Sequence, residues 1–489
     1  MIEHRVLKQR TFFSIVWTVA RVGWTSLVSL IIFAVLARKL NPGIFGVYAL
    51  ATILVDFMRI IASAGLTETI IREPAVDEEL ADTAFWSGVL ISLFAAAAVV
   101  LLAGPYAALV AQPKVVPVLW ALAIFIPVTS LGAVHLARKL GQFGHKAVTL
   151  RVMGGSLLGG GAAIVCAYRG MGVWSLVVQV GISEVVGVIL AWQAFKWVPR
   201  LHFSPSRFRS LLNFNGNVIV SQSIWMLMVR IQEIFIGRTL GTAAVGNYRV
   251  AWRMMELIRQ AITAPIGSVA LVTFSHLRDV PARFNAAYRR MLGLICLLTF
   301  PLIFGYGVLS DEIVHALFGN KWAHAAPVAQ VLALMAVPLT LNYFLGPAVL
   351  AKGASHANTK AATVQLLLTA VLSYLAAPYG VVAVAGAYVF RAYLTMPYQQ
   401  YLVYKYAGIH PLESLKDVWP PLLASLCMVG ALILAAPLLH LWFGRNALIL
   451  TASICFGALV YGAGLFVFGR SLVVSQVSEI RSLFGGGTV

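Results

Sequence analysis

Away from the ends of segments that are otherwise apolar enough to cross a membrane lie eleven ionisable residues, and seven of them are arginines. They are Arg21, Asp56, Arg59, Glu184, Arg230, Glu233, Arg249, Arg253, Glu256, Arg259 and Arg391. A charge at the bilayer centre costs about 3 kcal/mol on a lenient scale, so eleven lipid-facing charges would cost about 30 kcal/mol. Folded proteins are stable by only about 5–15 kcal/mol. The charges must therefore line water or pair inside a helical bundle, and the excess of arginine predicts an anionic ligand.

Helical geometry gathers many of these charges onto narrow faces. At about 100° per residue, the polar residues of segments 46–70 and 245–268 each fall on one side of a helix. Asp56/Arg59, Arg230/Glu233 and Arg253/Glu256 are among the pairs with the i,i+3 spacing at which opposite charges on one helix can neutralise each other. Arg21, Arg249 and Arg391 have no acidic residue at that spacing. Two interpretations of these charges therefore stand side by side: a polar cleft between helices, and neutralisation of opposite charges within each helix.

The composition predicts an all-α integral membrane protein. Sixty per cent of the 489 residues are apolar, 11% are charged, and the mean hydropathy is +0.87. Apolar runs near the length needed to span a bilayer predict about 14 transmembrane helices, at 13–37, 46–70, 83–103, 115–136, 149–168, 172–194, 212–236, 245–268, 289–309, 327–350, 360–378, 380–404, 419–440 and 447–468. The first run is too long for a signal peptide, so we expect it to be retained.

The basic residues are distributed asymmetrically between the connecting segments. If the N-terminus is cytoplasmic, 22 of the 36 Lys and Arg residues fall on the cytoplasmic side and seven on the other side. This positive-inside bias predicts that both termini are cytoplasmic. The same bias explains the net charge of +19, which in a soluble protein would suggest binding to nucleic acid. We therefore do not expect nucleic acid as a partner.

No motif for catalysis, metal binding or a cofactor stands out. The four cysteines lie inside expected spans, with no Cys-x-x-Cys pair and no His at ligand spacing. The sequence has no P-loop and no His-Glu-x-x-His zinc motif. We therefore expect a transporter rather than an enzyme, with no catalytic residue, no metal site and no cofactor.

An internal repeat appears at an offset of 200 residues. Seven residues recur at this offset without a gap, with Asp56 opposite Glu256: Arg38, Leu40, Gly46, Tyr48, Ala51, Arg59 and Ala64 match Arg238, Leu240, Gly246, Tyr248, Ala251, Arg259 and Ala264. Six spans separate the copies, which predicts two six-helix lobes, with a substrate site between them, plus two C-terminal helices.

The repeat predicts the domain boundaries. We expect an N-lobe at 1–197, a cytoplasmic amphipathic linker at 198–211, a C-lobe at 212–409, spans 13 and 14 at 410–470, and a cytoplasmic tail at 471–489. The linker carries Arg207 and Arg209 beside apolar residues, as a segment on a membrane surface does. We expect the acidic residues between Glu73 and Asp82 to be solvated.

Several motifs resemble Wzx-type polysaccharide flippases of the multidrug/oligosaccharidyl-lipid/polysaccharide exporter superfamily. The start of the second lobe, Ile236-Gly237-Arg238-Thr239-Leu240-Gly241 followed by Gly246-x-Tyr248, is similar to theirs, as is its first-lobe counterpart, residues 36–48. Residues 170–176 resemble the family's sequence at the start of span 6. Where family members often have Asp, this chain has Glu233. The resemblance covers essentially the whole chain.

The resemblance implies a function. Family members move undecaprenyl-diphosphate-linked oligosaccharide repeat units from the cytoplasmic to the periplasmic leaflet of the bacterial inner membrane by alternating access, with H⁺ or Na⁺ as the coupling cation. Polysaccharide polymerase and export proteins are the implied partners, besides membrane lipid. For binding the diphosphate or acidic sugars we expect Arg21, Arg59, Arg249, Arg253, Arg259 and Arg391. For charge balance or coupling we expect Asp56, Glu184, Glu233 and Glu256.

Three other functions are weighed against this one. A lipid II flippase of peptidoglycan synthesis would share the fold and the substrate chemistry. A drug or cation antiporter of the same superfamily tends to carry an acidic residue in span 1, which this chain lacks. A membrane polysaccharide polymerase needs a large periplasmic loop, and the longest here, at about 310–326, is too short.

Overall fold

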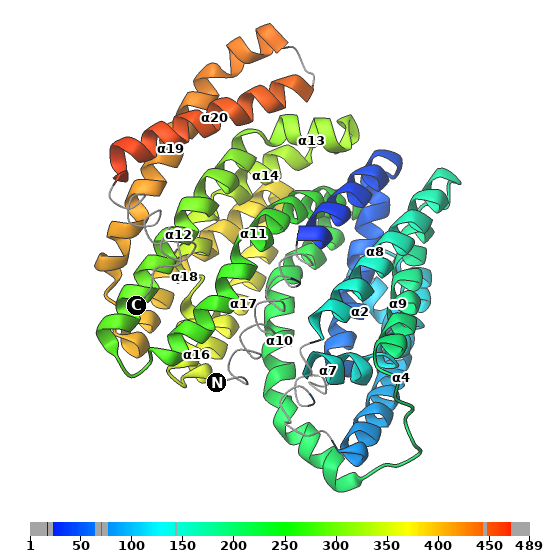
Figure 1. Cartoon of the computed structure of the whole chain (residues 1–489). Coiled ribbons are helices and arrows are strands. Elements are labelled where there is room, and N and C mark those ends of the chain that lie inside the picture. Colours follow the sequence, from blue (N-terminus) through cyan, green and yellow to red (C-terminus); the bar gives the residue numbers. More distant parts are fainter. Residues whose placement is uncertain are drawn as a thin grey trace. The chain divides into compact units, whose positions relative to one another are not determined.

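The structure is a computed structural model that describes residue 17 and residues 23–63, 70, 77–141, 144–443 and 447–470. Within these ranges the backbone forms helices and no strand, which confirms the all-α fold class (Figure 1). Arg21 and the expected tail at 471–489 lie outside the described residues.

The chain divides into two compact units, residues 1–249 and residues 250–489, with the division inside α11. The first unit contains a helix at 23–39 and, in chain order, α2 (Pro42–Ser63), α4 (Glu78–Leu109), α5 (Val115–Ala123), α6 (Phe125–Ser130), α7 (Ala133–Gly141), α8 (His145–Tyr168), α9 (Trp174–Ala194), α10 (Pro205–Leu240) and the start of α11 (Thr242–His276). The predicted lobe boundaries at 197 and 212 stay a prediction.

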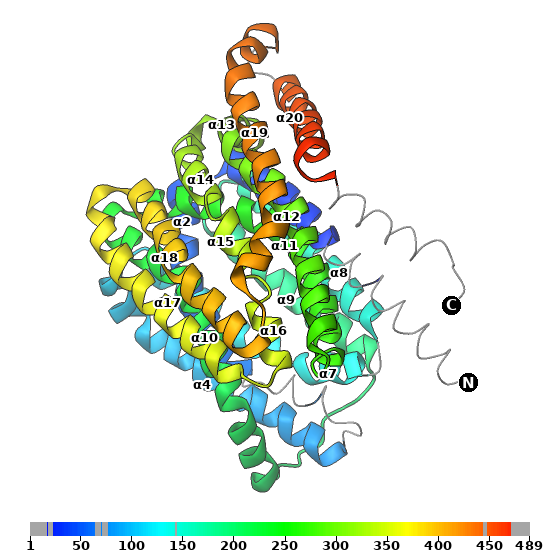
Figure 2. The same cartoon turned by 90° about the vertical axis from the view of Figure 1, so that its left-hand side faces the viewer.

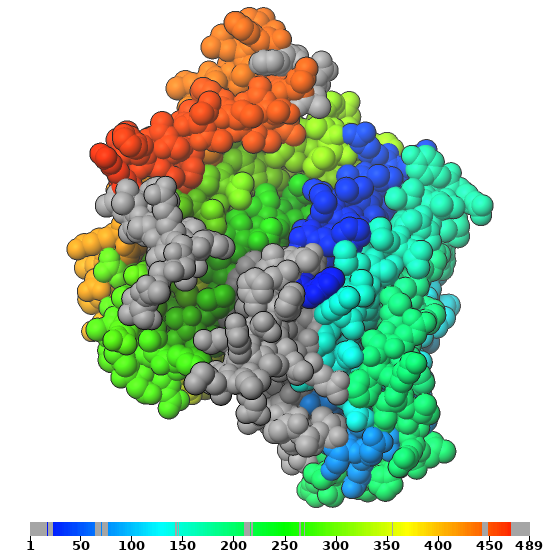
Figure 3. Space-filling model, in the orientation of Figure 1, coloured from blue at the N-terminus to red at the C-terminus, as the bar shows by residue number. Residues whose placement is uncertain are grey.

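The second unit contains the rest of α11 and the following helices: α12 (Pro281–Val308), α13 (Ser310–Phe318), η1 (Asn320–Trp322), α14 (Ala325–Ala333), α15 (Ala336–Leu341), α16 (Leu345–Ala351), α17 (Ser355–Ala376), η2 (Ala377–Tyr379), α18 (Val381–Ala407), α19 (Pro411–Phe443) and α20 (Ala447–Phe468). Its core is a buried aromatic cluster around Phe274, Tyr288 and Phe344. Helix α19 packs along α12, and α20 packs on α19 (Figure 2). Figure 3 shows α20 at the molecular surface, in red.

The number of spans differs from the expected fourteen. Among the described residues, nine helices are long and apolar enough to cross a membrane, or up to eleven if two bent pairs each count as one span. The bends are 41° between Val115–Ser130 and Ala133–Gly141, and 49° between Ala325–Ala333 and Ala336–Ala351. The other expected spans overlap the helix at 23–39, α11 and α18, which do not meet these criteria. In α11 four charged residues, Arg249, Arg253, Glu256 and Arg259, interrupt the apolar run. The count of fourteen stays a prediction.

Two tyrosines 200 residues apart make matching hydrogen bonds in the two units. In the first unit, the Tyr106 hydroxyl at the end of α4 donates to the Leu50 carbonyl of α2 at 2.8 Å. In the second unit, the Tyr306 hydroxyl at the end of α12 donates to the Ala251 carbonyl of α11, also at 2.8 Å. Both hydroxyls tie a long helix to a buried backbone carbonyl, so the 200-residue relationship extends to Tyr106 and Tyr306.

Within the first unit, the N-terminal ends of α2 and α11 cross at two glycines of the repeat. A Cβ on Gly46 would overlap the backbone of Thr242, and a Cβ on Gly246 would overlap the backbone of Pro42. Pro42 and Thr242 are themselves 200 residues apart, so the close approach is reciprocal. Only glycine lets two helix backbones come this close.

We predict that Gly246→Ala lowers the stability of the purified protein. The added methyl group must displace backbone rather than a flexible side chain, and such overpacking costs about 1–3 kcal/mol. Thermal unfolding in detergent measures the effect. Gly104→Ala in α4 is the matched control, because nothing lies within 4 Å of its added Cβ, so we expect it to be neutral or slightly stabilising. Equal melting temperatures for both variants would contradict the close packing.

Candidate anion-binding site

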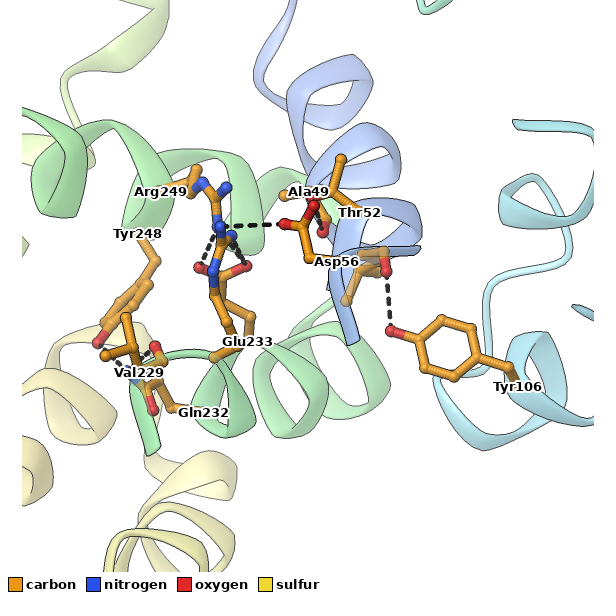
Figure 4. A network of polar contacts seen from close by, with 11 residues as sticks. Ala49, Thr52, Asp56, Tyr106, Val229, Gln232, Glu233, Tyr248 and Arg249 are labelled. Atoms are coloured by element: carbon orange, nitrogen blue, oxygen red, sulfur yellow. Dashed lines mark hydrogen bonds and ion pairs between the residues drawn. The ribbon is translucent and has the colours of Figure 1, made fainter. Parts of the chain in front are cut away.

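Four charged side chains form a partly buried network in the first unit (Figure 4). Glu233 of α10 is 1% exposed, and Nη1 of Arg249 in α11 donates to its two carboxylate oxygens at 2.8 and 3.0 Å. Arg230, one turn before Glu233, lies 3.6 Å from Glu233 and 3.6 Å from Asp56 of α2. Two arginines thus meet two carboxylates. The network is neutral overall and connects three helices.

Neutral hydrogen bonds support this network. The Gln232 side-chain amide donates to the Tyr248 hydroxyl at 3.1 Å, next to Glu233 on α10 and next to Arg249 on α11 (Figure 4). Gln232 and Tyr248 are both fully buried. This bond holds α10 and α11 together at the level of the ion pair, which restricts how far Arg249 can move from Glu233.

A second polar site in the first unit surrounds a cavity of about 300 Å³ between α2, α4, α6, α7 and α8. Arg59 and Arg151 line it together with the hydroxyl-bearing residues Ser63, Thr129 and Ser130. The two arginines carry donors suited to phosphate or carboxylate oxygens, whereas the three hydroxyls already donate to backbone carbonyls of their own helices.

Arg59 has donors to spare in this cavity. Its Nη1 lies 3.2 Å from Glu184 of α9. Its Nε and Nη2 are buried and have no hydrogen-bond partner among the described residues. A buried donor without an acceptor costs about 1–3 kcal/mol, more when it is charged. Beside its ion pair with Glu184, Arg59 therefore has two guanidinium donors that could donate to a further anionic group.

Arg151 is a site residue that the sequence-based assignment missed. It was counted among the basic residues of the cytoplasmic side, although it falls inside the expected span 149–168. In the structure α8 begins at His145, which places Arg151 well within the helix, with Nε donating to the Gly187 carbonyl of α9 at 3.1 Å. Its position inside an expected span was the signal from which the sequence could have indicated a site residue.

The second unit holds separate charged groups. In α11, the Glu256 carboxylate accepts from Arg259 at 2.7 and 2.5 Å and from Gln260 at 2.6 Å. In α18, Arg391 is 3% exposed and donates to Gln365 of α17 at 2.5 Å. Its guanidinium carbon lies 4.5 Å from the centre of the Tyr388 ring, a cation–π contact, and its Nε has no hydrogen-bond partner in the described part of the chain.

The structure rearranges the pairs suggested by sequence spacing. Arg230 and Glu233 do pair within one helix. Asp56, however, forms its ion pair with Arg230, and Arg59 forms its ion pair with Glu184 of another helix. The assigned residues therefore form three groups, which are Asp56 with Arg230, Glu233 and Arg249, then Arg59 with Glu184, and Glu256 with Arg259. Arg391 belongs to none of these groups, and Arg253 lies half-buried in α11. Their assigned roles stay predictions.

Long apolar helices with partly buried ion pairs define the class as a helical membrane protein, and solved structures share this fold. The structure of "Lipid II flippase MurJ, inward closed conformation" matches with a TM-score of 0.73, over 96% of this chain and 99% of that chain, at 14% identity. An inward-facing multidrug resistance MATE family transporter of the MOP superfamily matches with a TM-score of 0.66, over 79% and 95%, also at 14% identity. At this identity the likeness shows the fold alone.

The family profile described as "Polysaccharide biosynthesis protein" matches residues 35–327, more than half of the chain. The chain belongs to this family, as a Wzx-type polysaccharide flippase of the multidrug/oligosaccharidyl-lipid/polysaccharide exporter superfamily. This confirms the predicted family, the multi-pass membrane location and a transporter rather than an enzyme.

Curated relatives agree with this assignment. The succinoglycan biosynthesis transport protein ExoT of Rhizobium meliloti (strain 1021) is 28% identical over 65% of this chain and 66% of its own length. The lipopolysaccharide biosynthesis protein WzxC of Escherichia coli (strain K12) is 20% identical over 68% and 70%. The teichuronic acid biosynthesis protein TuaB of Bacillus subtilis (strain 168) is 23% identical over 61% and 62%. The chain thus matches about two thirds of the length of these relatives, and they do not favour the lipid II alternative.

We predict that Glu233→Gln strongly destabilises the protein. Removing one partner of a buried ion pair leaves Arg249 without the Glu233 carboxylate and Arg230 with Asp56 alone, and costs about 3–5 kcal/mol. Thermal unfolding in detergent measures this effect. Adding Arg249→Gln in the same chain should recover part of the loss, whereas Glu79→Gln on the surface should change little. Additive losses in the double variant would argue against the network.

Proposed function

We propose that this chain is a flippase that moves undecaprenyl-diphosphate-linked oligosaccharide repeat units from the cytoplasmic to the periplasmic leaflet of the bacterial inner membrane. The observation that carries the proposal is the cavity lined by Arg59 and Arg151, since two buried donors of Arg59 have no acceptor among the described residues. A diphosphate is multiply anionic, and arginine donates to phosphate oxygens through two parallel hydrogen bonds. The polyprenyl tail would stay in lipid while the cavity holds the charged head group.

The remaining arginines divide by how fully they are neutralised. Arg249 and Arg259 are held by carboxylates at 2.8 and 2.5 Å, so a ligand would have to compete with Glu233 or Glu256. Arg391 donates to the neutral Gln365 and stacks on the ring of Tyr388, and no carboxylate forms an ion pair with it in the described part of the second unit. We assign Arg59 the leading role in binding and keep Arg21, Arg253 and Arg391 as further binding residues.

The acidic residues are suited to charge balance and to coupling with H⁺ or Na⁺. Protonation of Glu233 would weaken its hold on Arg249 and release that arginine for the substrate. Asp56 would then remain as the carboxylate partner of Arg230. Glu184 acts on the binding cavity itself, because it sets how much of the Arg59 charge is available. Cation exchange at these carboxylates would thus change the charge that the substrate meets.

Alternating access would be controlled where α2 and α11 begin. The reciprocal contact of Gly46 and Gly246 closes the helices against each other at one end. Opening there must separate two backbones that hold each other mainly by shape, which is a low barrier compared with breaking a buried ion pair. The relatives act in the biosynthesis of different polymers, which supports a repeat unit of an exopolysaccharide, capsule or O-antigen as the cargo.

We predict that Arg59→Gln and Arg151→Gln each reduce flipping of a lipid-diphosphate-linked oligosaccharide in proteoliposomes by about tenfold or more. Each loses charge-assisted hydrogen bonds of about 1.5–3 kcal/mol. Arg59→Lys should retain intermediate activity, because it keeps the charge and loses the fork. Arg278→Gln, a charge change at an exposed position of the second unit, is the matched control. Full activity of folded Arg59→Gln protein would disprove the role of the cavity.

A deletion strain separates this function from its alternative. Without the protein, lipid-diphosphate-linked repeat units should accumulate on the cytoplasmic side while peptidoglycan synthesis continues. Mass spectrometry of extracted lipids, with and without periplasmic glycosidase treatment of spheroplasts, measures both the amount and the sidedness. Accumulation of lipid II in place of the repeat unit would favour a role in peptidoglycan synthesis.

A further inference from the structure

The segment that connects α9 and α10 is fastened to the start of α4 through its backbone (Figure 1). The Arg200 amide donates to the Asp82 carboxylate at 2.9 Å, and the Arg200 carbonyl accepts from the Trp86 indole at 2.7 Å. The Ser204 amide donates to the Thr83 hydroxyl at 3.1 Å. Three directed bonds therefore fix which way the side chains of this segment point.

Side chains strengthen the same attachment. Trp197 is buried; its carbonyl lies 2.9 Å from His135 Nε2, and its indole donates to Glu78 at 3.2 Å. Arg207, in the first turn of α10, pairs with Asp77 at 3.0 Å. Asp82 is buried and anchors the segment, so for this residue the expectation of a solvated side chain is wrong. Asp77, Glu78 and Glu79 contact the segment but remain exposed, as expected, and Glu73 lies outside the described residues.

The outer side of this segment combines exposed apolar and basic side chains. Val198 is 73% exposed, Leu201 91% and Phe203 47%. Lys196, Arg200 and Arg209 are exposed as well. We call residues 196–209 the linker surface. Apolar residues interleaved with basic ones are typical of segments that lie in the interface of an anionic membrane.

The place on α4 at which the linker surface is attached agrees with a location at the membrane interface. The strongly exposed apolar side chains of α4 run from Leu90 to Leu109, which in a helix spans about 29 Å, close to the hydrocarbon thickness of a bilayer. Trp86, which holds Arg200, lies four residues before Leu90, or about 6 Å outside that band. The linker surface therefore lies at the depth of the lipid head groups.

We propose that the linker surface is a binding surface for anionic phospholipid head groups, with Val198, Leu201 and Phe203 inserted among the lipids and Lys196, Arg200 and Arg209 contacting the phosphates. The hydrogen bonds between this segment and α4 would make the lipid contact part of the first unit, because they attach the linker surface to a helix long and apolar enough to span the membrane. The proposal does not depend on the identity of the transported substrate.

The test uses the full chain with the native residues Cys166, Cys296, Cys427 and Cys455 replaced by Ala and an environment-sensitive fluorophore on Leu201→Cys. The protein is reconstituted in neutral phosphatidylcholine vesicles and in vesicles that also contain phosphatidylglycerol. We expect quenching by lipids spin-labelled near the head group and protection from aqueous iodide, both stronger in the anionic vesicles. Replacing Lys196, Arg200 and Arg209 together by Gln should remove the preference for anionic vesicles. We expect each lost charge to weaken the lipid association, as measured by quenching, by about fivefold.

Two matched variants control the test. A label on Phe94→Cys, which is 69% exposed in the apolar band of α4, should be quenched equally in both vesicle types and reports that the protein is inserted and folded. Arg278→Gln should leave the Leu201 signal unchanged. Iodide quenching of the Leu201 label that is strong and equal in both vesicle types overturns the membrane contact. Equal immersion in neutral and anionic vesicles overturns the assignment to anionic head groups.

Discussion

A charged side chain inside a membrane has to find an opposite charge, a hydrogen-bond partner or water, because lipid offers none of these. This constraint governs the arrangement of the helices in the first unit. Asp56, Glu233 and Arg249 come from three different helices, and Arg230 connects two of them. Since each carboxylate is neutralised only when these helices stand at the right height and rotation, the ion pairs specify the packing as well as stabilise it.

Much of the fold could be predicted from the sequence, because hydropathy and composition act locally. Every expected apolar segment overlaps a helix in the described part of the chain. The partners of the charges could not be predicted in the same way. Helical phase shows which way Arg59 points along its own helix, but not that Glu184, 125 residues away, faces it. For the same reason Asp82 was expected to be solvated, whereas its buried carboxylate holds the backbone of Arg200.

The internal repeat illustrates the same division between local and long-range information. The sequence places Gly46 and Gly246 in equivalent positions without a reason for glycine at either one. The structure supplies the reason, since each glycine admits the backbone of the other helix. Tyr106 and Tyr306 extend the correspondence to a second pair of helices, where a conventional hydrogen bond replaces a close backbone contact. Repeated residues therefore mark places where a specific contact, rather than general hydrophobicity, is required.

The difference between neutralised and partly neutralised arginines bears on which of them can bind substrate. A ligand at Arg249 must first displace Glu233, whose buried carboxylate would then keep only the longer contact with Arg230 at 3.6 Å, and this loss offsets part of the gain. A ligand at Arg59, the binding residue that we propose, would meet donors that lack acceptors among the described residues, so its binding would remove a penalty that the free protein carries. Glu184 limits this attraction by holding one side of the guanidinium. An arginine with only part of its hydrogen-bond donors occupied can bind an anion and still release it, as a carrier requires. An arginine that is permanently paired, or one that has no partner at all, does not combine these two properties.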